Sequence, residues 1–215
     1  AGKADFFVNE AFGAHHPAAS TTILPTLLPH GVGLRFATEV ETLSKIRNEQ
    51  ALSSGNEPKK PLVAIVGGVK IEDKYPAILA LAKFCDAVLV GGLLAQNIKD
   101  QKLEVPMNTM VGKLSESGID MADETIEAFI KLIKNAKQIV WAGPLGKYEE
   151  EAGNIGNKKL AEAIVSSGAE SIVGGGDTIS ALKNYLDKFS FVSVGGGAML
   201  KLLVDGTLPT IEVLN

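Results

Sequence analysis

The sequence is poor in the residues that build disulfides, zinc sites and nucleophilic triads. Its 215 residues contain one cysteine, Cys85, and three histidines, His15, His16 and His30, all in the amino-terminal part. A single cysteine excludes an internal disulfide and is typical of a reducing compartment, so we expect a cytoplasmic protein. No group of histidine and cysteine has the spacing of a zinc site, and serine or cysteine triads lack a candidate histidine.

Long apolar runs and an excess of positive charge are also missing. No run reaches the roughly 20 residues that a membrane-spanning helix requires, and nothing resembles a signal peptide, so we expect no membrane partner. The net charge of −4 and the pI of about 5.5 argue against binding to nucleic acid. The composition, 46% hydrophobic and 21% charged, is that of an ordinary soluble globular protein. We expect a monomer with one large domain or two small ones.

What the sequence does contain is a repeated alternation of apolar runs and helical patterns. Amphipathic helices are indicated where apolar residues recur three and four apart, as at Ile126, Phe129, Ile130 and Ile133, and after Gly176 at Ile179, Leu182 and Leu186. The alternation predicts an α/β fold, a three-layer Rossmann-like parallel sheet with helices on both faces. The apolar runs are 62–66, 87–90, 139–141, 171–173 and 191–194. Residues 99–122 are polar and poorly patterned, and no element is predicted there.

Each apolar run is followed by glycine at its carboxyl end. In open parallel sheets the ligand crevice lies beyond those ends, and glycine lets backbone N–H groups approach an anion. A single glycine pair is usually only a turn, but five such ends at one edge predict a ligand site. In Gly174-Gly175-Gly176-Asp177-Thr178, Asp177 is placed to hold a cation beside the anion, and Thr178 to cap the helix or contact the same ligand. We therefore expect a site for phosphate and a metal ion.

Two lysines and a glutamate add to this interpretation. Lys70 and Lys74 follow Gly67-Gly68 one helical turn apart, so both could reach the same anion. A solvated helix start is the alternative, although a cation there opposes the helix dipole. Glu149 could bind ribose hydroxyls, but by itself it is more simply explained as a surface glutamate. Dinucleotide and P-loop fingerprints are both absent, whereas phosphoryl transfer asks mainly for positioning and charge neutralisation.

Five motifs stand in a fixed order along the chain. They are Asn9-Glu10-Ala11-Phe12-Gly13 within 7–15, Gly67-Gly68-Val69-Lys70 within 66–74, Trp141-Ala142-Gly143-Pro144 within 141–146, Gly174-Gly175-Gly176-Asp177-Thr178, and Gly195-Gly196-Gly197-Ala198 within 194–198. This series resembles the phosphoglycerate kinases, from Ala4 to Leu214 with one weak interval. The resemblance implies two Rossmann-like lobes joined by a hinge, one for MgATP or MgADP and one for 3-phosphoglycerate or its 1,3-bisphosphate. It also implies the reversible glycolytic transfer of the acyl phosphate of 1,3-bisphosphoglycerate to ADP.

The resemblance assigns roles to individual residues. Lys70 would contact the transferring phosphoryl group, and Gly195 and Gly196 would begin the helix that receives this group. His16 and Arg35 lie at or near positions where the family has arginines for its substrate. The nucleotide would be bound by Gly68, Lys74, Gly91, Gly92, Pro144, Glu149, Gly174, Gly175, Gly176, Asp177 and Thr178, with Asp177 as the ligand of Mg²⁺.

The chain also departs from the family's pattern. Ala142 replaces the asparagine of the usual Trp-Asn-Gly-Pro, and His16 stands in place of arginine. Most of the amino lobe has no counterpart, and the chain opens at Ala1 inside what resembles a domain, so we expect that upstream residues are missing. The predicted domains are 1–38 for the end of the amino lobe, 39–60 for a hinge helix and linker (53–60 being a polar loop), and 61–215 for the nucleotide lobe.

Three hypotheses follow. The chain is a fragment of a working phosphoglycerate kinase, or a degenerate relative that binds nucleotide without turnover. The third is an unrelated enzyme that binds a phosphate ligand on the same kind of sheet.

Overall fold

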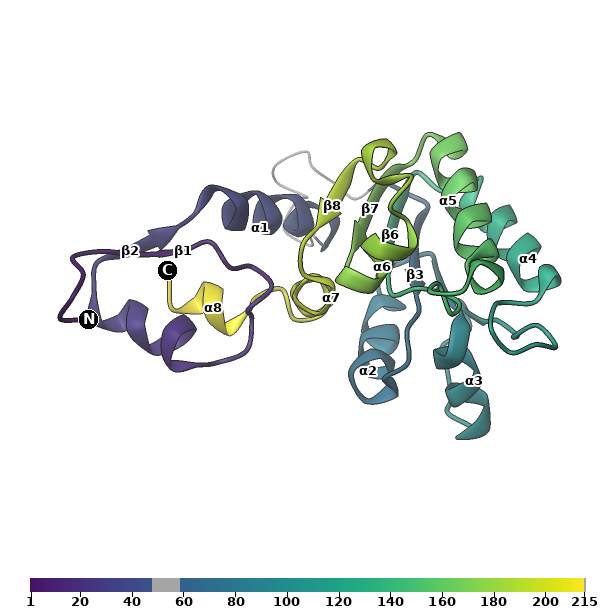
Figure 1. Ribbon diagram of the computed structural model, residues 1–215, viewed down its shortest axis with the longest axis horizontal. Coiled ribbons are helices and arrows are strands. Elements are labelled where there is room, and N and C mark those ends of the chain that lie inside the picture. The colour runs from purple at the N-terminus through teal and green to yellow at the C-terminus, as the bar shows by residue number, and fades with distance from the viewer. Residues whose placement is uncertain (48–58, 215) are drawn as a thin grey trace. The chain divides into compact units, whose positions relative to one another are not determined.

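The computed structural model describes residues 1–47 and 59–214, which form two compact units (Figure 1). One unit is Ala1–Pro58 with Val194–Asn215, and the other is Lys59–Ser193. This division differs from the predicted ranges 1–38, 39–60 and 61–215, because 194–215 groups with the amino-terminal residues. The functional meaning of the three ranges stays a prediction, and most of the predicted polar loop at 53–60 lies outside the described residues. No helix in the described part of the chain is long and apolar enough to cross a membrane.

The Lys59–Ser193 unit is built on a six-stranded parallel sheet, which confirms the predicted fold class. Its strand order is β5-β4-β3-β6-β7-β8. From β3 the chain moves outward to β4 and β5, then returns to the other side of β3 and moves outward again. The order is therefore that of a doubly wound sheet, with its switch point between β3 and β6. The strands are β3 (Leu62–Val66), β4 (Ala87–Val90), β5 (Thr109–Val111), β6 (Gln138–Ala142), β7 (Glu170–Gly174) and β8 (Phe191–Ser193).

Helices cover both faces of this sheet. All five residues of β3 and of β6 are buried, which is typical of strands covered on both sides. Ile65 and Trp141 belong to one apolar core with Phe129 and Leu160, which come from the adjacent helices α4 and α5 (Figure 1). Leu62, Ala64 and Val66 of β3 point to the opposite face of the sheet, and α2 packs both on β3 and on α3. The helices are α2 (Ile71–Leu81), α3 (Gly92–Asp100), α4 (Asp123–Ile133), α5 (Ile155–Ser167) and α6 (Gly176–Ala181).

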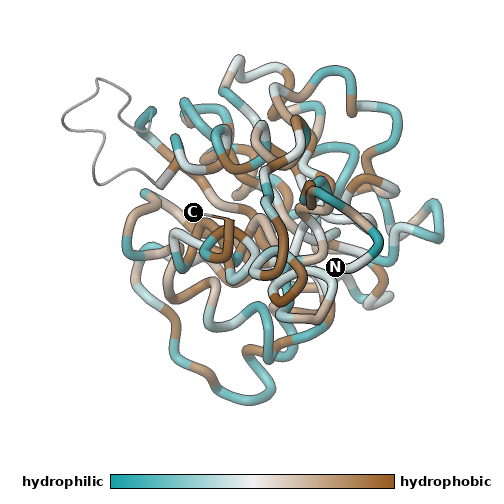
Figure 2. Tube along the Cα trace, turned by 90° about the vertical axis from the view of Figure 1, so that its left-hand side faces the viewer, coloured by the Kyte–Doolittle hydropathy of each residue, from teal (hydrophilic) through white to brown (hydrophobic). Residues whose placement is uncertain are grey.

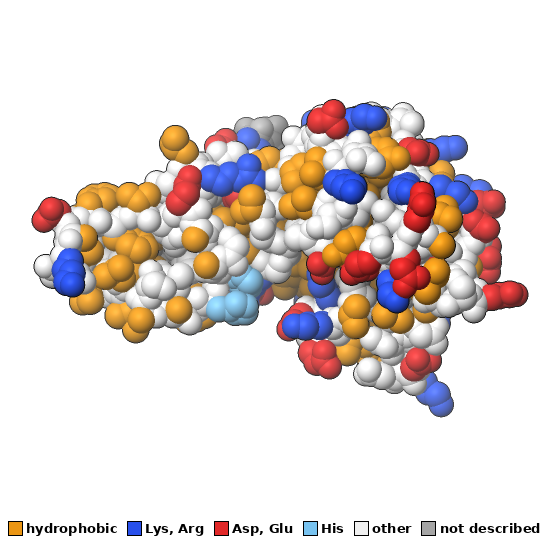
Figure 3. Space-filling view, viewed as in Figure 1, with side chains coloured by type: hydrophobic (Ala, Val, Ile, Leu, Met, Phe, Trp, Pro, Cys, Tyr) orange, Lys and Arg blue, Asp and Glu red, His pale blue; other side chains and the backbone are white. Residues whose placement is uncertain are grey.

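Surface composition agrees with this layering. Hydrophilic residues alternate with hydrophobic ones along the outer segments of the trace, as expected of amphipathic helices (Figure 2). Basic and acidic side chains are mixed over the visible face of Lys59–Ser193 rather than gathered into a basic patch (Figure 3). Cys85 is buried, and burial raises the pKa of its thiol to about 12, as expected for a structural cysteine.

Three elements differ from the sequence prediction. Strand β5 lies within 99–122, where none was predicted, and its three residues are too few to show a pattern. Helix α3 was also missed, although its buried residues Leu94, Ala95 and Ile98 have helical spacing. The helix after Gly176 was expected to reach Leu186, but α6 ends at Ala181.

The other unit contains the first two strands and the helices α1 (Leu34–Arg47), α7 (Gly196–Asp205) and α8 (Pro209–Glu212). Strand β1 (Phe7–Asn9) pairs in parallel with β2 (His30–Val32), and two short helical segments (Ala19–Ile23 and Leu24–Leu27) lie between them. Glu10 accepts hydrogen bonds from the N–H groups of Arg35 and Phe36 at 2.9 and 3.2 Å, so a carboxylate caps the start of α1. Helix α7 packs on α1, which explains why 194–215 groups with the amino-terminal residues.

Candidate functional site

The carboxyl ends of β3 and β6 are joined by backbone contacts at the switch point of the sheet. The N–H of Gly67 donates to the Ala142 carbonyl, and that of Gly68 to the Pro144 carbonyl, both at 2.9 Å. A Cβ at Gly67 would lie 2.3 Å from the Pro144 oxygen, and one at Gly143 would lie 2.1 Å from the Gly67 oxygen. Neither position has room for a side chain, so glycine is required for the two loops to meet.

The glycine-rich loop after β7 is tied to the same place. Gly175 has a φ of 103° and forms the N-cap of α6, a conformation that glycine adopts without strain. Thr178 is buried, and its hydroxyl oxygen accepts a hydrogen bond from the Gly143 N–H at 2.8 Å. The expectation that Thr178 caps the helix is therefore wrong, because the cap is Gly175 and Thr178 instead links two loops. Phosphate contacts from Thr178, Gly174, Gly175 and Gly176 stay predictions.

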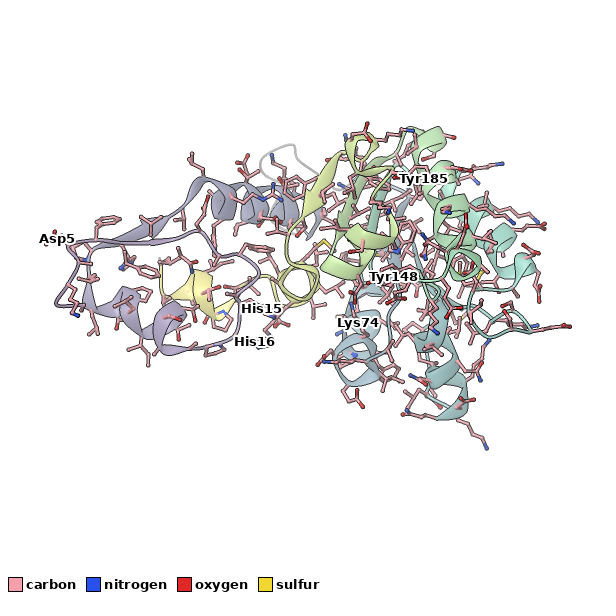
Figure 4. The ribbon with its side chains drawn as sticks, viewed as in Figure 1. Asp5, His15, His16, Lys74, Tyr148 and Tyr185 are labelled. Atoms are coloured by element: carbon pink, nitrogen blue, oxygen red, sulfur yellow. The ribbon has the colours of Figure 1, made fainter. Side chains whose placement is uncertain are left out.

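Lys74 lies at this edge (Figure 4), within electrostatic range of Asp177. The half-buried Lys74 side chain lies over the first loop, since a Cβ at Gly68 would be 4.0 Å from Lys74 Cε. Burial lowers the pKa of the Lys74 amine, and the charges of Asp73 and Asp177 partly oppose this shift. No ion pair within 4 Å joins Lys74 to either carboxylate among the described residues, so its charge is only partly compensated.

Tyr148 connects the loop after β6 to Asp177. Its hydroxyl donates a hydrogen bond to Asp177 Oδ1 at 3.2 Å. Burial and the Asp177 carboxylate raise the pKa of the Tyr148 hydroxyl, and the charge of the neighbouring Glu149 adds to the same shift. Glu149 is exposed, which leaves its carboxylate available to a ligand. The structure thus brings Lys74, Asp177, Tyr148 and Glu149 to one end of the sheet.

Other predicted nucleotide residues have packing roles. Gly91 and Gly92 are buried, and a Cβ at Gly91 would lie 2.7 Å from Met121 Sδ. Leu145 covers both glycines, with its carbonyl carbon 3.1 Å from a Cβ at Gly92. Contact of Gly91, Gly92 and Pro144 with a nucleotide stays a prediction.

Lys70 is exposed and forms the N-cap of α2. It makes no hydrogen bond or ion pair with residues that the structure describes, so its ammonium is available to an anion. Its contact with a transferring phosphoryl group also stays a prediction.

The remaining predicted residues lie in the other unit. Gly195 is the N-cap of α7 and Gly196 its first residue. A Cβ at Gly195 would lie 2.9 Å from Gly13 Cα, so the glycine allows a close backbone approach to the loop that leads to the two histidines. The rings of His15 and His16 are 4.1 Å apart (Figure 4). His16, Gly195 and Gly196 therefore belong to one unit, and their predicted roles are untested by this arrangement.

Arg35 is engaged by a buried carboxylate. Its Nη2 atom lies 2.7 Å from Glu39 Oε1, and Glu39 is fully buried. The same oxygen accepts the Val194 N–H at 2.9 Å. Because a buried carboxylate is costly without a partner, Arg35 stabilises this unit, and substrate binding by Arg35 stays a prediction.

The residues at the edge of the sheet fit a magnesium ion that arrives with phosphates. Asp177 is an exposed carboxylate, and the described part of the chain contains no cluster of three or more side chains suited to a metal. Mg²⁺ usually keeps several waters and binds through one or two carboxylates plus substrate phosphates. Asp177 would hold the ion, which would neutralise phosphate charge when bound.

Sequence reasoning missed the residues that support the loop after β6. Asn157 is fully buried, its Oδ1 accepts the Leu145 N–H at 2.9 Å, and its Nδ2 donates to Asn154 Oδ1 at 2.9 Å. Asn154 in turn donates to the Ala181 carbonyl at the end of α6. Two asparagines at the start of an amphipathic helix were the available signal. Asp120, which accepts the Gly156 N–H at 2.7 Å, lies in the segment without pattern and gave none.

Fold and site together define a doubly wound α/β protein of the Rossmann type, a class in which ligands usually bind beyond the carboxyl ends of the strands at the switch point. A family model described as phosphoglycerate kinase matches residues 1–116 and 101–206. The phosphoglycerate kinase of Mycoplasmoides gallisepticum is 32% identical over 272 residues, covering 100% of this chain and 64% of the relative. That of Akkermansia muciniphila is 33% identical over 267 residues, covering 100% and 65%.

A solved structure agrees with these matches. The phosphoglycerate kinase of Coxiella burnetii has a TM-score of 0.79 at 31% identity, covering 98% of this chain and 66% of that one. The chain belongs to the phosphoglycerate kinase family, which confirms the resemblance and excludes the hypothesis of an unrelated enzyme. It spans slightly less than two thirds of the length of the curated relatives it matches.

Proposed function

We propose that the Lys59–Ser193 unit binds MgADP and MgATP at the carboxyl edge of its sheet. The observation that carries this proposal is the placement of Lys74 at the switch point within electrostatic range of Asp177, where a half-buried lysine lacks a close ion pair and the Asp177 side chain is exposed. A polyphosphate would supply the charge that Lys74 lacks, and its bound Mg²⁺ would take Asp177 as a ligand.

We further propose that the chain takes part in the reaction for which its relatives are named. The acyl phosphate of 1,3-bisphosphoglycerate would move to ADP, and the reverse reaction would use ATP and 3-phosphoglycerate. Lys70, exposed at the start of α2, would neutralise charge on the transferring group. Gly195 and Gly196 would offer backbone N–H groups at the start of α7. His16 and Arg35 would contact the phosphoglycerate, and the reaction would take place in the cytoplasm.

Calorimetric titration with ADP, with and without Mg²⁺, tests nucleotide binding. We expect Mg²⁺ to tighten ADP binding by roughly tenfold, about 1.4 kcal/mol. Asp177→Asn removes this gain and leaves the Mg²⁺-free affinity unchanged. Asp187→Asn, another exposed aspartate of the same β7–β8 connection, serves as the matched control and keeps the gain. Absence of ADP binding by the unchanged chain would overturn the proposal.

A second candidate function is nucleotide binding without turnover. The pairing of Arg35 with buried Glu39 favours it, because a guanidinium that already neutralises a carboxylate has less charge to offer a substrate phosphate. A coupled assay of ATP formation from 1,3-bisphosphoglycerate and ADP separates the two. Turnover dismisses the second candidate, whereas MgADP binding without turnover dismisses the kinase.

A further inference from the structure

We infer that Tyr148 is a positioning residue for Asp177 and sets the strength with which the site takes up Mg²⁺. The Tyr148 hydroxyl holds Asp177 Oδ1 at 3.2 Å. Among described residues Oδ2 receives no hydrogen bond, so it is the oxygen left for a cation. The inference rests on the proposed function, since it concerns the ion that accompanies the nucleotide.

Tyr148 is fixed from both ends. Its ring packs against the apolar core that α4 and α5 form with the sheet, and its N–H donates to the Gly146 carbonyl at 2.9 Å. Packing of the ring therefore restrains the Tyr148 side chain and keeps its hydroxyl beside Asp177.

Asp177 needs such a partner because nothing else in the described structure restrains its carboxylate. It is exposed at the second position of a helix of six residues. A free carboxylate must lose rotational freedom when it binds a cation. A hydrogen bond to one oxygen removes part of that loss beforehand, and outer partners of this kind typically contribute 10- to 100-fold to metal affinity. Since this bond is long and near solvent, we expect a smaller factor, about 3- to 10-fold.

The experiment measures the Mg²⁺ concentration that gives half of the full gain in ADP affinity. Tyr148→Phe keeps the ring and removes only the hydroxyl, so we expect this concentration to rise about 3- to 10-fold with Mg²⁺-free ADP binding unchanged. Tyr185→Phe is the matched control, because the Tyr185 hydroxyl donates to Glu162 Oε1 at 2.8 Å and its ring packs on the same core (Figure 4). We expect Tyr185→Phe to leave the Mg²⁺ concentration for half of the gain in ADP affinity unchanged. Circular dichroism melting verifies that both variants are folded.

Combining Tyr148→Phe with Asp177→Asn separates positioning from a general structural effect. If Tyr148 acts through Asp177, the double variant behaves as Asp177→Asn alone. An unchanged or lowered Mg²⁺ midpoint in Tyr148→Phe overturns the inference while ADP binding stands. Failure of the unchanged chain to bind ADP overturns the proposed function and this inference together.

Discussion

Replacing Gly67 by alanine tests whether the junction between β3 and β6 is as tight as the structure indicates. The added Cβ would lie 2.3 Å from the Pro144 oxygen and 2.7 Å from the Gly143 oxygen. Both are backbone atoms, so no side chain can move aside. The two loops must separate, and the hydrogen bonds from Gly67 and Gly68 to the β6 side, both 2.9 Å long, stretch with them.

The cost follows from these two effects. Overpacking that moves backbone typically costs about 1–3 kcal/mol, and each of the two hydrogen bonds contributes about 1 kcal/mol when intact. With partial loss of both bonds, we expect Gly67→Ala to lower the free energy of unfolding by about 3 kcal/mol. For a chain of this length that corresponds to a melting temperature roughly 6–12 °C lower.

Trp141 provides the assay. It is the only tryptophan of the chain, it is fully buried in β6, and its Nε1–H donates to the Gly143 carbonyl at 2.9 Å. Its fluorescence during urea unfolding therefore reports on this junction. Gly176→Ala is the control, because a Cβ there meets nothing within 4 Å, and we expect it to change stability by less than about 1 kcal/mol. Equal stability of the two variants would refute the close contact.

Two further predictions concern charged side chains. Lys74→Met raises the melting temperature without ligand and weakens ADP binding roughly tenfold or more, with adenosine as the control ligand. Between the lowered pKa of Lys74 in the folded protein and its ordinary value of 10.5, the unfolded chain binds more protons than the folded one, so the free energy of unfolding rises with pH in this window. Urea titrations across this pH range should show the rise in the unchanged chain and not in Lys74→Met. Arg35→Leu leaves the buried Glu39 carboxylate without this partner and lowers stability by about 2–4 kcal/mol by circular dichroism. Adding Glu39→Gln restores part of the loss, and an Arg35→Leu protein of full stability would contradict the structural role of Arg35.

The sheet was predictable because its central strands are buried on both faces. Continuous apolar runs such as 62–66 and 139–141 leave few alternatives once helices separate them. Edge strand β5 was not predictable, since it has three residues that are only partly buried or exposed. The grouping of 194–215 with α1 was also hidden, because it depends on packing between segments that lie more than 150 positions apart in the sequence.

The candidate site was predictable in its residue types but not in its contacts. Glycine, lysine and aspartate after successive strands pointed to one edge, and Lys74 does lie within electrostatic range of Asp177 there. No pattern could reveal that Thr178 turns inward to Gly143 or that Arg35 reaches Glu39. Tyr148 was not among the predicted site residues, because only the folded structure brings its hydroxyl within hydrogen-bonding distance of Asp177.

The edge of the sheet combines loops held in place by close contacts with a lysine, Lys74, whose charge is only partly compensated. Glycine contacts and the Asn154–Asn157 amides fix the loops in place. Lys74 is half-buried beside these loops, and burial lowers the pKa of its amine. Under the proposed function, an arriving phosphate would remove that cost of burial, and its binding would stabilise the folded unit beyond what the contacts alone contribute. The melting temperature should consequently rise more with ADP in the unchanged chain than in Lys74→Met, although the variant starts from the more stable state.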